Sequence, residues 1–147
     1  MTTIRRLSAD DVALADATFA LIADVFEDEY EPRDSVVGLP ALLADDRFWA
    51  FAALDGDEVV GGLTAHVVPM TRDATDELFI YDVAVRPDRQ RQGVGRLLMT
   101  ATIAAAAADG IDVVFVAADD DDEHALDFYR ALGGRPGPAT FFDFGAD

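Results

Sequence analysis

The first quarter of the chain combines a short extended pattern with a helical one. Residues 4–7 read as an edge strand, with apolar residues at both ends. Ser8 followed three residues later by Asp11 resembles a capping box with Asp in place of Glu, which predicts a helix over about residues 10–26. The helix is supported by apolar residues that recur at helical spacing: Leu14, Leu21, Ile22, Val25 and Phe26.

The next segment predicts a short helix and a β-hairpin. Pro40 suits the first position of a helix. The apolar runs 48–54 and 59–68 predict two strands, because the intervening residues 55–58 form a strong hairpin signal. The pair Gly61 and Gly62 inside the second strand predicts a bulge or a close approach of another backbone.

The second half of the chain predicts a strand, a helix and a parallel strand. Residues 77–85 are rich in β-branched and aromatic residues, and an alanine-rich helix is predicted over 97–109 with Gly110 as its left-handed cap. Residues 113–117 are fully apolar, which is typical of a strand buried on both faces. Together these elements predict a βαβ unit with parallel strands.

The C-terminal part predicts a final helix and strand. An acidic loop leads into a helix that carries Tyr129 and ends at Gly133 and Gly134, and residues 140–144 are expected to form a last strand. A length of 147 residues suits one domain, so we expect residues 1–147 to form a single unit around one core.

The composition limits the classes of partner and compartment. The formal charge is −18, so the surface should repel nucleic acid and anionic membranes and attract cations, although a salt-rich cytoplasm or a GC-rich genome would also explain an Asp-rich chain. The chain has no cysteine, which excludes disulfides and a cysteine nucleophile. Residues 1–11 are polar and no apolar run approaches about 18 residues, so a soluble, cytoplasmic protein is expected.

The turn after residue 85 has the chemistry of a phosphate site. Gly93 and Gly95 precede an apolar helix whose first N–H groups lack internal partners, and Arg89, Arg91 and Arg96 add positive charge. The turn lacks the Gly-Lys-Ser/Thr of nucleoside triphosphatases and the three glycines of a dinucleotide fingerprint. An ordinary tight turn remains an alternative for this pattern taken alone.

Two sequence motifs carry a family resemblance. Gln90-Arg91-Gln92-Gly93-Val94-Gly95 after a Val-Ala-Val strand resembles the acetyl-CoA pyrophosphate loop of the Gcn5-related N-acetyltransferases (GNAT), and residues 125–133 resemble their tyrosine-bearing helix. Residues 80–85, the acidic loop 118–123 and Phe141-Phe142-Asp143 are similar to the small aminoglycoside 3-N-acetyltransferases (gentamicin acetyltransferase type I). The resemblance runs from about residue 10 to the end of the chain.

This resemblance implies a fold and a cofactor. The expected α/β (α+β) fold has a mixed, mostly antiparallel sheet, splayed near residue 81, with helices on both faces. The expected cofactor is acetyl-CoA, held partly by strand backbone that is free of sheet partners. The implied cofactor-binding residues are Val83, Ala84, Val85, Gln90, Arg91, Gln92, Gly93, Val94, Gly95, Arg96 and Phe128.

The resemblance also suggests two catalytic side chains. Tyr129 would donate a proton or a hydrogen bond to the CoA thiolate, unless it is a core tyrosine. Asp82 would receive the proton of the acceptor amine or bind its ammonium form, unless it is a buried structural acid. Strand alternation places Asp82 on the face opposite Tyr81. Glu77 or a water chain are the other possible bases.

Acidic runs suggest where a cationic acceptor would bind. The run 27–31 is either a solvated helix end or the wall of a cation-binding cleft. The loop 119–123 could hold a polycation, although Asp122 and Glu123 are also expected to cap the following helix. The candidate acceptor-binding residues are Tyr81, Asp119, Asp120, Asp121, Asp122, Glu27 and Glu29.

The hypothesis from the sequence is direct acetyl transfer to a small polycationic amine. The favoured acceptor is the 3-amino group of an aminoglycoside, which implies a role in antibiotic resistance. The alternatives are a GNAT enzyme that acetylates a polyamine or a protein lysine or N-terminal amine, and a sensor that binds acyl-CoA without catalysis. No metal site is expected, neither His66 nor His124 receives a role, and the resemblance allows a homodimer.

Overall fold

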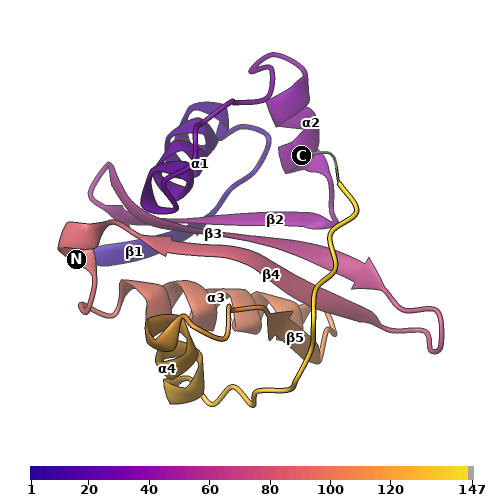
Figure 1. The fold of residues 1–147 in the computed structure, drawn as a ribbon. Helices are drawn as coiled ribbons and strands as arrows, with labels where there is room; N and C mark the ends of the chain where they lie inside the picture. The colour runs from indigo at the N-terminus through magenta and orange to yellow at the C-terminus, as the bar shows by residue number, and fades with distance from the viewer. Residues whose placement is uncertain (146–147) are drawn as a thin grey trace. The chain divides into compact units, whose positions relative to one another are not determined.

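A computed structural model describes residues 1–145 of the chain (Figure 1). The chain divides into two compact units, of which unit 1 comprises Met1–Ala117 and unit 2 begins at Ala118. Within residues 1–145, no helix has both the length and the apolar composition needed to cross a membrane. The two units are described separately, and the single-domain organisation stays a prediction.

Unit 1 is built on a five-stranded sheet. The strands are arranged in chain order, with the first four antiparallel and the last pair parallel, as expected for a mixed, mostly antiparallel sheet. The parallel pair flanks a helix, which confirms the predicted βαβ unit. The strands are β1 (Thr2–Arg6), β2 (Phe48–Asp55), β3 (Glu58–Pro69), β4 (Asp76–Val85) and β5 (Val113–Val116).

Helices cover both faces of this sheet, which confirms the expected α/β layering. α1 (Val12–Val25) and α2 (Gly38–Ala44) lie on one face, and α3 (Val94–Ala108) lies on the other (Figure 1). A short 3-10 helix, η1 (Pro87–Arg89), connects β4 to the turn before α3. Unit 2 contains α4 (Glu123–Ala131) and an extended C-terminal segment.

Gly61 and Gly62 allow helices to pack closely against both faces of β3. A Cβ on Gly62 would lie 2.6 Å from Thr18 Cγ2 of α1, and a Cβ on Gly61 would lie 3.0 Å from Ala84 O and 3.3 Å from Leu98 Cδ1 of α3. The predicted close approach is therefore confirmed. The missing side chain of Gly62 also lets Thr18 and Ile22 of α1 lie directly against β3.

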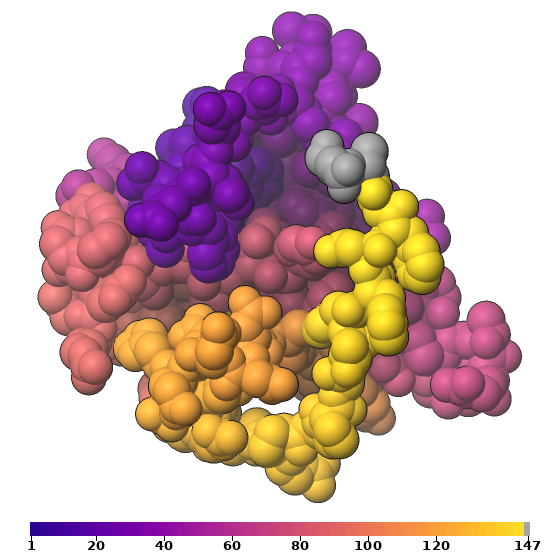
Figure 2. Space-filling view, in the orientation of Figure 1, coloured from indigo at the N-terminus to yellow at the C-terminus, as the bar shows by residue number. Residues whose placement is uncertain are grey.

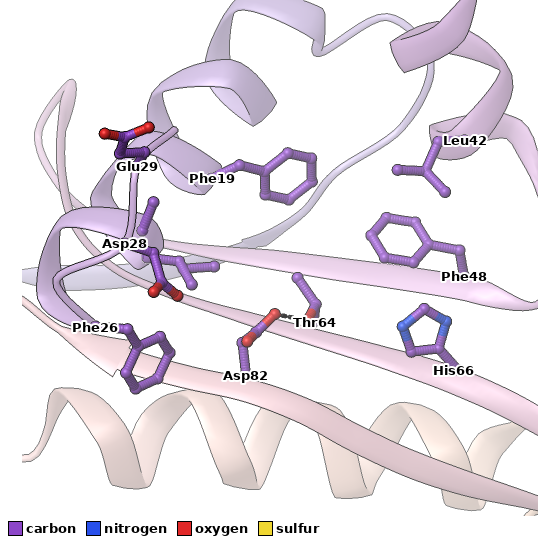
Figure 3. A pocket seen from close by; sticks show the side chains of 11 residues that line it. Phe19, Phe26, Asp28, Glu29, Leu42, Phe48, Thr64, His66 and Asp82 are labelled. Atoms are coloured by element: carbon purple, nitrogen blue, oxygen red, sulfur yellow. Dashed lines mark hydrogen bonds between the residues drawn. The ribbon is translucent and has the colours of Figure 1, made fainter. Parts of the chain in front are cut away.

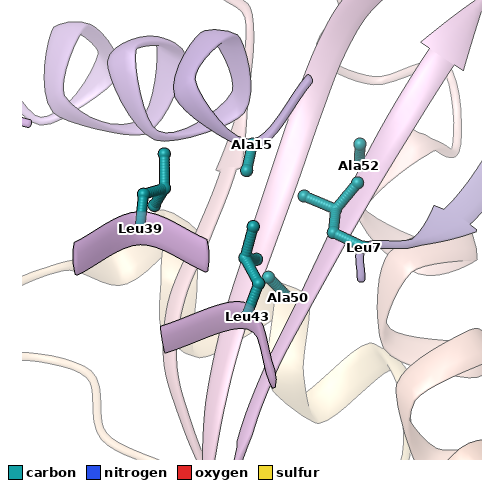
Figure 4. Close-up of a cluster of buried hydrophobic side chains, with 6 residues drawn as sticks. All are labelled: Leu7, Ala15, Leu39, Leu43, Ala50 and Ala52. Atoms are coloured by element: carbon teal, nitrogen blue, oxygen red, sulfur yellow. The ribbon is translucent and has the colours of Figure 1, made fainter. Parts of the chain in front are cut away.

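Small side chains carry the packing between the sheet and the helices α1 and α2. Ala50 and Ala52 of β2 face Ala15 of α1 and the two buried leucines of α2, Leu39 and Leu43 (Figure 4). Burial of one such leucine contributes about 1.5–3 kcal/mol, and the alanines let the layers approach closely enough to exclude water.

The starts of the three helices of unit 1 differ from the sequence expectations. α2 begins at Gly38, so Pro40 is its third residue, and α3 begins at Val94, three residues before the predicted start. α1 begins at Val12 rather than near residue 10, because Asp11 accepts hydrogen bonds from Ser8 N at 2.8 Å and Ser8 Oγ at 3.2 Å and closes a turn ahead of the helix.

Two strand predictions near the C-terminus were wrong. β5 is not buried on both faces: Val113 is 49% exposed and Phe115 is 41% exposed, because β5 is an edge strand. Residues 140–144 form no strand among residues 1–145; they are extended but enter no ladder, and their three phenylalanines are exposed. A short phenylalanine-rich segment cannot specify a strand without a partner for its backbone hydrogen bonds.

Candidate active site

A β-bulge at Tyr81 shapes the centre of the sheet. Thr64 of β3 pairs with Asp82 of β4, whereas the next residue, Ala65, pairs with Ile80, so Tyr81 is the extra residue. The expectation that Tyr81 and Asp82 face opposite sides is therefore wrong. The Tyr81 ring packs against His66, 5.9 Å between centroids, and His66 lines the same pocket as Asp82.

The sheet opens beyond this bulge. β4 and β5 are paired only from Glu77↔Val113 to Ile80↔Val116, and β5 ends there. Residues 81–85 of β4 therefore continue without a ladder partner on the side away from β3, within the part of the chain that the structure describes. This confirms the expected splay near residue 81, and it leaves backbone groups of residues 81–85 without a sheet partner on that side, although Val85 O accepts a hydrogen bond from Gln90 Nε2 at 3.1 Å.

A pocket of about 310 Å³ lies on the α1 face of the sheet in unit 1 (Figure 3). The space-filling view shows this face recessed beside α1 (Figure 2). Aromatic and aliphatic side chains form most of its wall, and three carboxylates interrupt them. The lining residues are Phe19, Ile22, Ala23, Phe26, Asp28, Glu29, Leu42, Phe48, Thr64, His66 and Asp82.

Asp82 is held at the floor of this pocket by Thr64. Thr64 Oγ1 donates a hydrogen bond of 2.5 Å to Asp82 Oδ2, drawn as the dashed line in Figure 3. Thr64 is only 6% exposed, whereas Asp82 is half-buried. One carboxylate oxygen is thus engaged by the protein, while the side chain still lines the pocket.

The turn after α1 supplies the other two carboxylates. Asp28 N–H donates to Ala23 O at 2.9 Å and Glu27 N–H donates to Asp24 O at 3.1 Å, which is the Schellman pattern of helix termination. Glu27 has the left-handed φ of 59° that this position usually reserves for glycine. The turn brings Asp28 and Glu29 to the pocket; in Figure 3 Asp28 points inward and Glu29 lies farther out.

A hydrogen bond from Tyr30 ties the acidic segment back to α1. Tyr30 Oη donates to Asp16 Oδ1 at 2.6 Å, and burial together with the Asp16 carboxylate raises the pKa of the Tyr30 phenol. The phenol therefore stays protonated and keeps donating over the whole neutral range. The segment that carries Asp28 and Glu29 is anchored at both ends.

Aromatic rings continue from the pocket across the sheet. Phe48, His66, Phe79 and Phe115 are successive cross-strand neighbours on β2, β3, β4 and β5. The outer pairs are in ring contact, with centroids 5.4 Å apart for Phe48 and His66 and 4.9 Å apart for the stacked Phe79 and Phe115, and the Tyr81 ring lies against both His66 and Phe79. Such a row suits the apolar faces of a ring-shaped ligand.

The loop before α3 has the geometry of an anion site. Gly93 has a left-handed φ of 84°, and nothing lies within 4 Å of the position its Cβ would take. The first internal bond of α3 runs from Leu97 N–H to Gly93 O at 3.0 Å, so the preceding N–H groups of the helix point outward. These donors and the positive helix end can receive a phosphate.

The arginines of this loop fall into two groups. Arg89 is ion-paired with Asp55, and Arg86 donates to Glu58 Oε1 at 2.5 Å and to Asp88 Oδ1 at 2.6 Å, so both anchor the loop. Arg91 and Arg96 are exposed and enter no ion pair within residues 1–145. Arg91 also has a left-handed φ of 62°, an uncommon conformation that often marks functional sites.

Unit 2 contains α4 and its capping residues. Asp122 Oδ1 accepts a hydrogen bond from Ala125 N at 3.1 Å, which confirms Asp122 as the predicted helix cap. Gly134 N–H donates to Tyr129 O at 2.9 Å and Gly133 has a φ of 92°, so the predicted glycine termination is confirmed as well. Burial raises the pKa of the Tyr129 phenol, and the Asp122 carboxylate adds to this effect.

The structure brings together part of the predicted acceptor site. Asp82 and Glu29 line one pocket, whereas Glu27 and Tyr81 are not among its lining residues. Asp119, Asp120 and Asp121 are exposed residues of unit 2, and their part in acceptor binding stays a prediction, as do the cofactor contacts of Ala84, Gln90, Gln92, Val94, Gly95 and Phe128. Sequence reasoning included Asp28 only as part of the acidic run 27–31, missed Thr64 and gave His66 no role. Thr64 and His66 are residues of β3 that line the pocket.

Comparisons with known proteins match this arrangement. Over 86 residues the chain is 36% identical to mycothiol acetyltransferase of Rhodococcus jostii (strain RHA1), which covers 58% of this chain and 28% of that protein. The chain thus spans less than a third of the length of this curated relative. The crystal structure of the aminoglycoside acetyltransferase meta-AAC0020, from an uncultured soil metagenomic sample, is 34% identical, with a TM-score of 0.93 over 99% of this chain and 97% of the other.

Two further findings concern the same group. The same aminoglycoside acetyltransferase has a crystal structure in complex with sisomicin, again with a TM-score of 0.93. A second soil metagenomic aminoglycoside acetyltransferase, HMB0005, is 31% identical with a TM-score of 0.92, and the match covers 100% of this chain and 99% of that one. Residues 15–133 match the acetyltransferase (GNAT) family. The matched region contains the loop before α3, the splayed strand β4 and α4. The chain therefore belongs to the acetyltransferase (GNAT) family.

Proposed function

We propose that this protein transfers the acetyl group of acetyl-CoA to the 3-amino group of an aminoglycoside, and that it thereby protects a cell from such antibiotics. The observation that carries the proposal is the pocket on the α1 face, where Asp28, Glu29 and Asp82 lie among aromatic side chains. Several carboxylates suit a polycation, and aromatic walls suit its ring faces. The likeness to an aminoglycoside acetyltransferase in complex with sisomicin supports this choice of acceptor.

The residues of unit 1 fit the proposed cofactor. The pyrophosphate would bind at the N–H groups that open α3, beside Arg91 and Arg96. The pantetheine arm would bond to the backbone of Val83 and Val85, where β4 is paired with β3 on one side and its ladder with β5 has already ended at Ile80. Acetyl-CoA supplies the acetyl group as an activated thioester.

The catalytic roles follow from the chemistry of amine acylation. Asp82 would bind the acceptor ammonium and take up the proton that the amine loses, directly or through water. Tyr129 would donate a hydrogen bond or a proton to the departing sulfur, and its raised pKa keeps the phenol protonated. Proximity of the two substrates contributes about 7–11 kcal/mol of barrier lowering without any covalent enzyme intermediate.

A second acceptor class is favoured by one comparison. The chain is 29% identical over 92 residues to [ribosomal protein bS18]-alanine N-acetyltransferase of Salmonella typhimurium, spanning 51% of that protein. The alternative function is therefore acetylation of a protein N-terminal amine. Because a peptide N-terminus carries a single positive charge, it would gain less from the three carboxylates of the pocket than a polycation would.

The experiment that tests the proposal measures release of the CoA thiol from acetyl-CoA. The purified protein is offered gentamicin, kanamycin, spermidine and a peptide with an N-terminal alanine, at two salt concentrations. Turnover confined to the aminoglycosides, with nuclear magnetic resonance placing the new amide on the 3-amino group, supports the proposal. Turnover confined to spermidine or the peptide would replace the acceptor, and acetyl-CoA binding without turnover would favour the sensor.

A further inference from the structure

We infer that Thr64 is a positioning residue for the proposed acetyl transfer, and that it acts by holding the Asp82 carboxylate in the orientation that receives the acceptor amine. This inference rests on the proposed function. It adds a residue that neither the sequence motifs nor the family likeness singles out.

The first step of the argument is the bulge. With regular pairing, Thr64 would oppose Tyr81, and Asp82 would point to the α3 face of the sheet. The extra residue at Tyr81 instead places Asp82 opposite Thr64, so both side chains emerge on the α1 face. The bulge therefore creates the Thr64 and Asp82 pair and brings the carboxylate into the pocket.

The second step is the geometry of the pair. Thr64 Oγ1 donates a 2.5 Å hydrogen bond to Asp82 Oδ2, and the two residues are paired across β3 and β4 directly beside the bulge. Thr64 is 6% exposed and is β-branched, so its χ1 angle is restricted and its hydroxyl is a rigid donor. Asp82 is only half-buried, and without this bond its carboxylate could rotate.

The third step is the consequence for chemistry. A carboxylate with Oδ2 engaged presents Oδ1 to the pocket, where the other charged groups are Asp28 and Glu29 from the turn after α1. No arginine lines this pocket, so an incoming ammonium would meet Asp82 without a competing guanidinium; His66 is the lining residue that can itself carry a positive charge. Because Oδ1 is held in one orientation, less conformational freedom is lost when the carboxylate and the amine reach the geometry for proton transfer.

The test uses Thr64→Val, which keeps the shape of the side chain and removes the donor, and Thr64→Ser, which keeps the donor. Thr102→Val is the matched control, because Thr102 is also buried but donates to Leu98 O within α3. We expect Thr64→Val to lower kcat by about tenfold or more, with an unchanged KM for acetyl-CoA. Thr64→Ser should restore most of kcat, and Thr102→Val should leave it unchanged.

A double-mutant cycle separates positioning from direct contact with the acceptor. If Thr64 acts through Asp82, Thr64→Val combined with Asp82→Asn should lose no more activity than Asp82→Asn alone. Additive losses, or a Thr64→Val enzyme within about twofold of the wild type, would overturn the inference. Acetyl-CoA binding by each variant verifies that it is folded, and Thr64→Ala replaces the valine variant if that one is not.

Failure of the proposed function gives a different result. A wild-type protein that releases no CoA thiol with any amine would remove the proposed function and the inference together. If the wild type turns over and Thr64→Val leaves kcat unchanged, only the inference about Thr64 fails.

Discussion

Arg89 of η1 is ion-paired with Asp55 at the end of β2, and this contact ties the loop before α3 to the β2–β3 hairpin. The pKa of Asp55 is lowered, chiefly by the hydrogen bond from Arg89 and by its charge. The amino group of Met1 lies 3.6 Å from the same carboxylate. The proposed pyrophosphate loop is therefore anchored to the last residue of β2.

Removal of this anchor should weaken cofactor binding. We expect Asp55→Asn to raise the Kd for CoA by up to about fivefold, because Arg89 loses its partner and the loop becomes less ordered. Asp57→Asn in the same hairpin is the control, since Asp57 enters no ion pair among residues 1–145. Titration calorimetry at low salt measures both, and equal Kd values for the two variants would contradict the anchoring role.

Tyr129→Phe should reduce the rate of thiol release while leaving CoA binding intact. The expected loss in kcat is about tenfold or more, because the departing sulfur loses its donor. Burial and Asp122 raise the pKa of Tyr129, so in the wild type any alkaline decline due to this phenol should have its midpoint above the ordinary tyrosine pKa, near 10. Steady-state kinetics from pH 6 to pH 10.5 provide the check, and an unchanged kcat in the variant would refute the donor role.

Asp28 is expected to contribute to acceptor affinity. Asp28→Asn should raise KM for an aminoglycoside by about two- to fivefold and leave KM for acetyl-CoA unchanged, because one pocket carboxylate is lost. Asp24→Asn is the control, since Asp24 is exposed on α1 and lies outside the pocket lining. The effect of Asp28→Asn should shrink at high salt; a salt-independent change would point to altered packing instead.

Glu27→Gly should stabilise the fold. α3 and α4 end with Gly110 and Gly133 at the left-handed position, whereas α1 places Glu27 there with a φ of 59°. Relief of this conformation should raise the free energy of unfolding by about 1 kcal/mol, as measured by urea denaturation. Gly110→Ala, the reverse change at the end of α3, should lower it, and a destabilised Glu27→Gly variant would show that the Glu27 side chain has a compensating role.

Asp11 should make the stability depend on pH in the acid range. Its pKa is lowered by the N–H of Ser8, the Ser8 hydroxyl and Arg5, whose Nη2 lies 2.5 Å from Asp11 Oδ1. The stabilisation is therefore complete above the ordinary aspartate pKa, near 4, and is lost as the pH falls through the lower folded value.

The corresponding substitution is Asp11→Asn. At pH 7 it should lower the thermal midpoint by about 3–6 °C, and this difference should narrow as the pH falls below the ordinary aspartate pKa, near 4, because the carboxylate of the unfolded chain then takes up its proton. Thermal unfolding followed by circular dichroism at both pH values supplies the measurement. A difference that is the same at pH 7 and pH 2.5 would exclude the charged form of Asp11 as the source.

Local patterns in the sequence were sufficient for most of the helices and strands of unit 1 and for the proposed cofactor loop. Apolar periodicity located β2, β3 and β4, and glycine preference located the ends of α3 and α4 at Gly110 and Gly133. The loop with Gly93 is readable because both of its signals, a left-handed residue and a helix start, are properties of neighbouring residues. Each of these predictions depended only on residues that are close together in the chain.

Tertiary structure decided the face on which Asp82 lies, the residues that accompany it, and the fate of residues 140–144. Side-chain alternation predicts a face only while a ladder is regular, and the bulge at Tyr81 is defined by the pairing of β3 with β4. Asp28 and Thr64 reach one pocket because Gly62 lets α1 pack closely on the sheet. These relationships depend on contacts between distant segments, which no local pattern encodes.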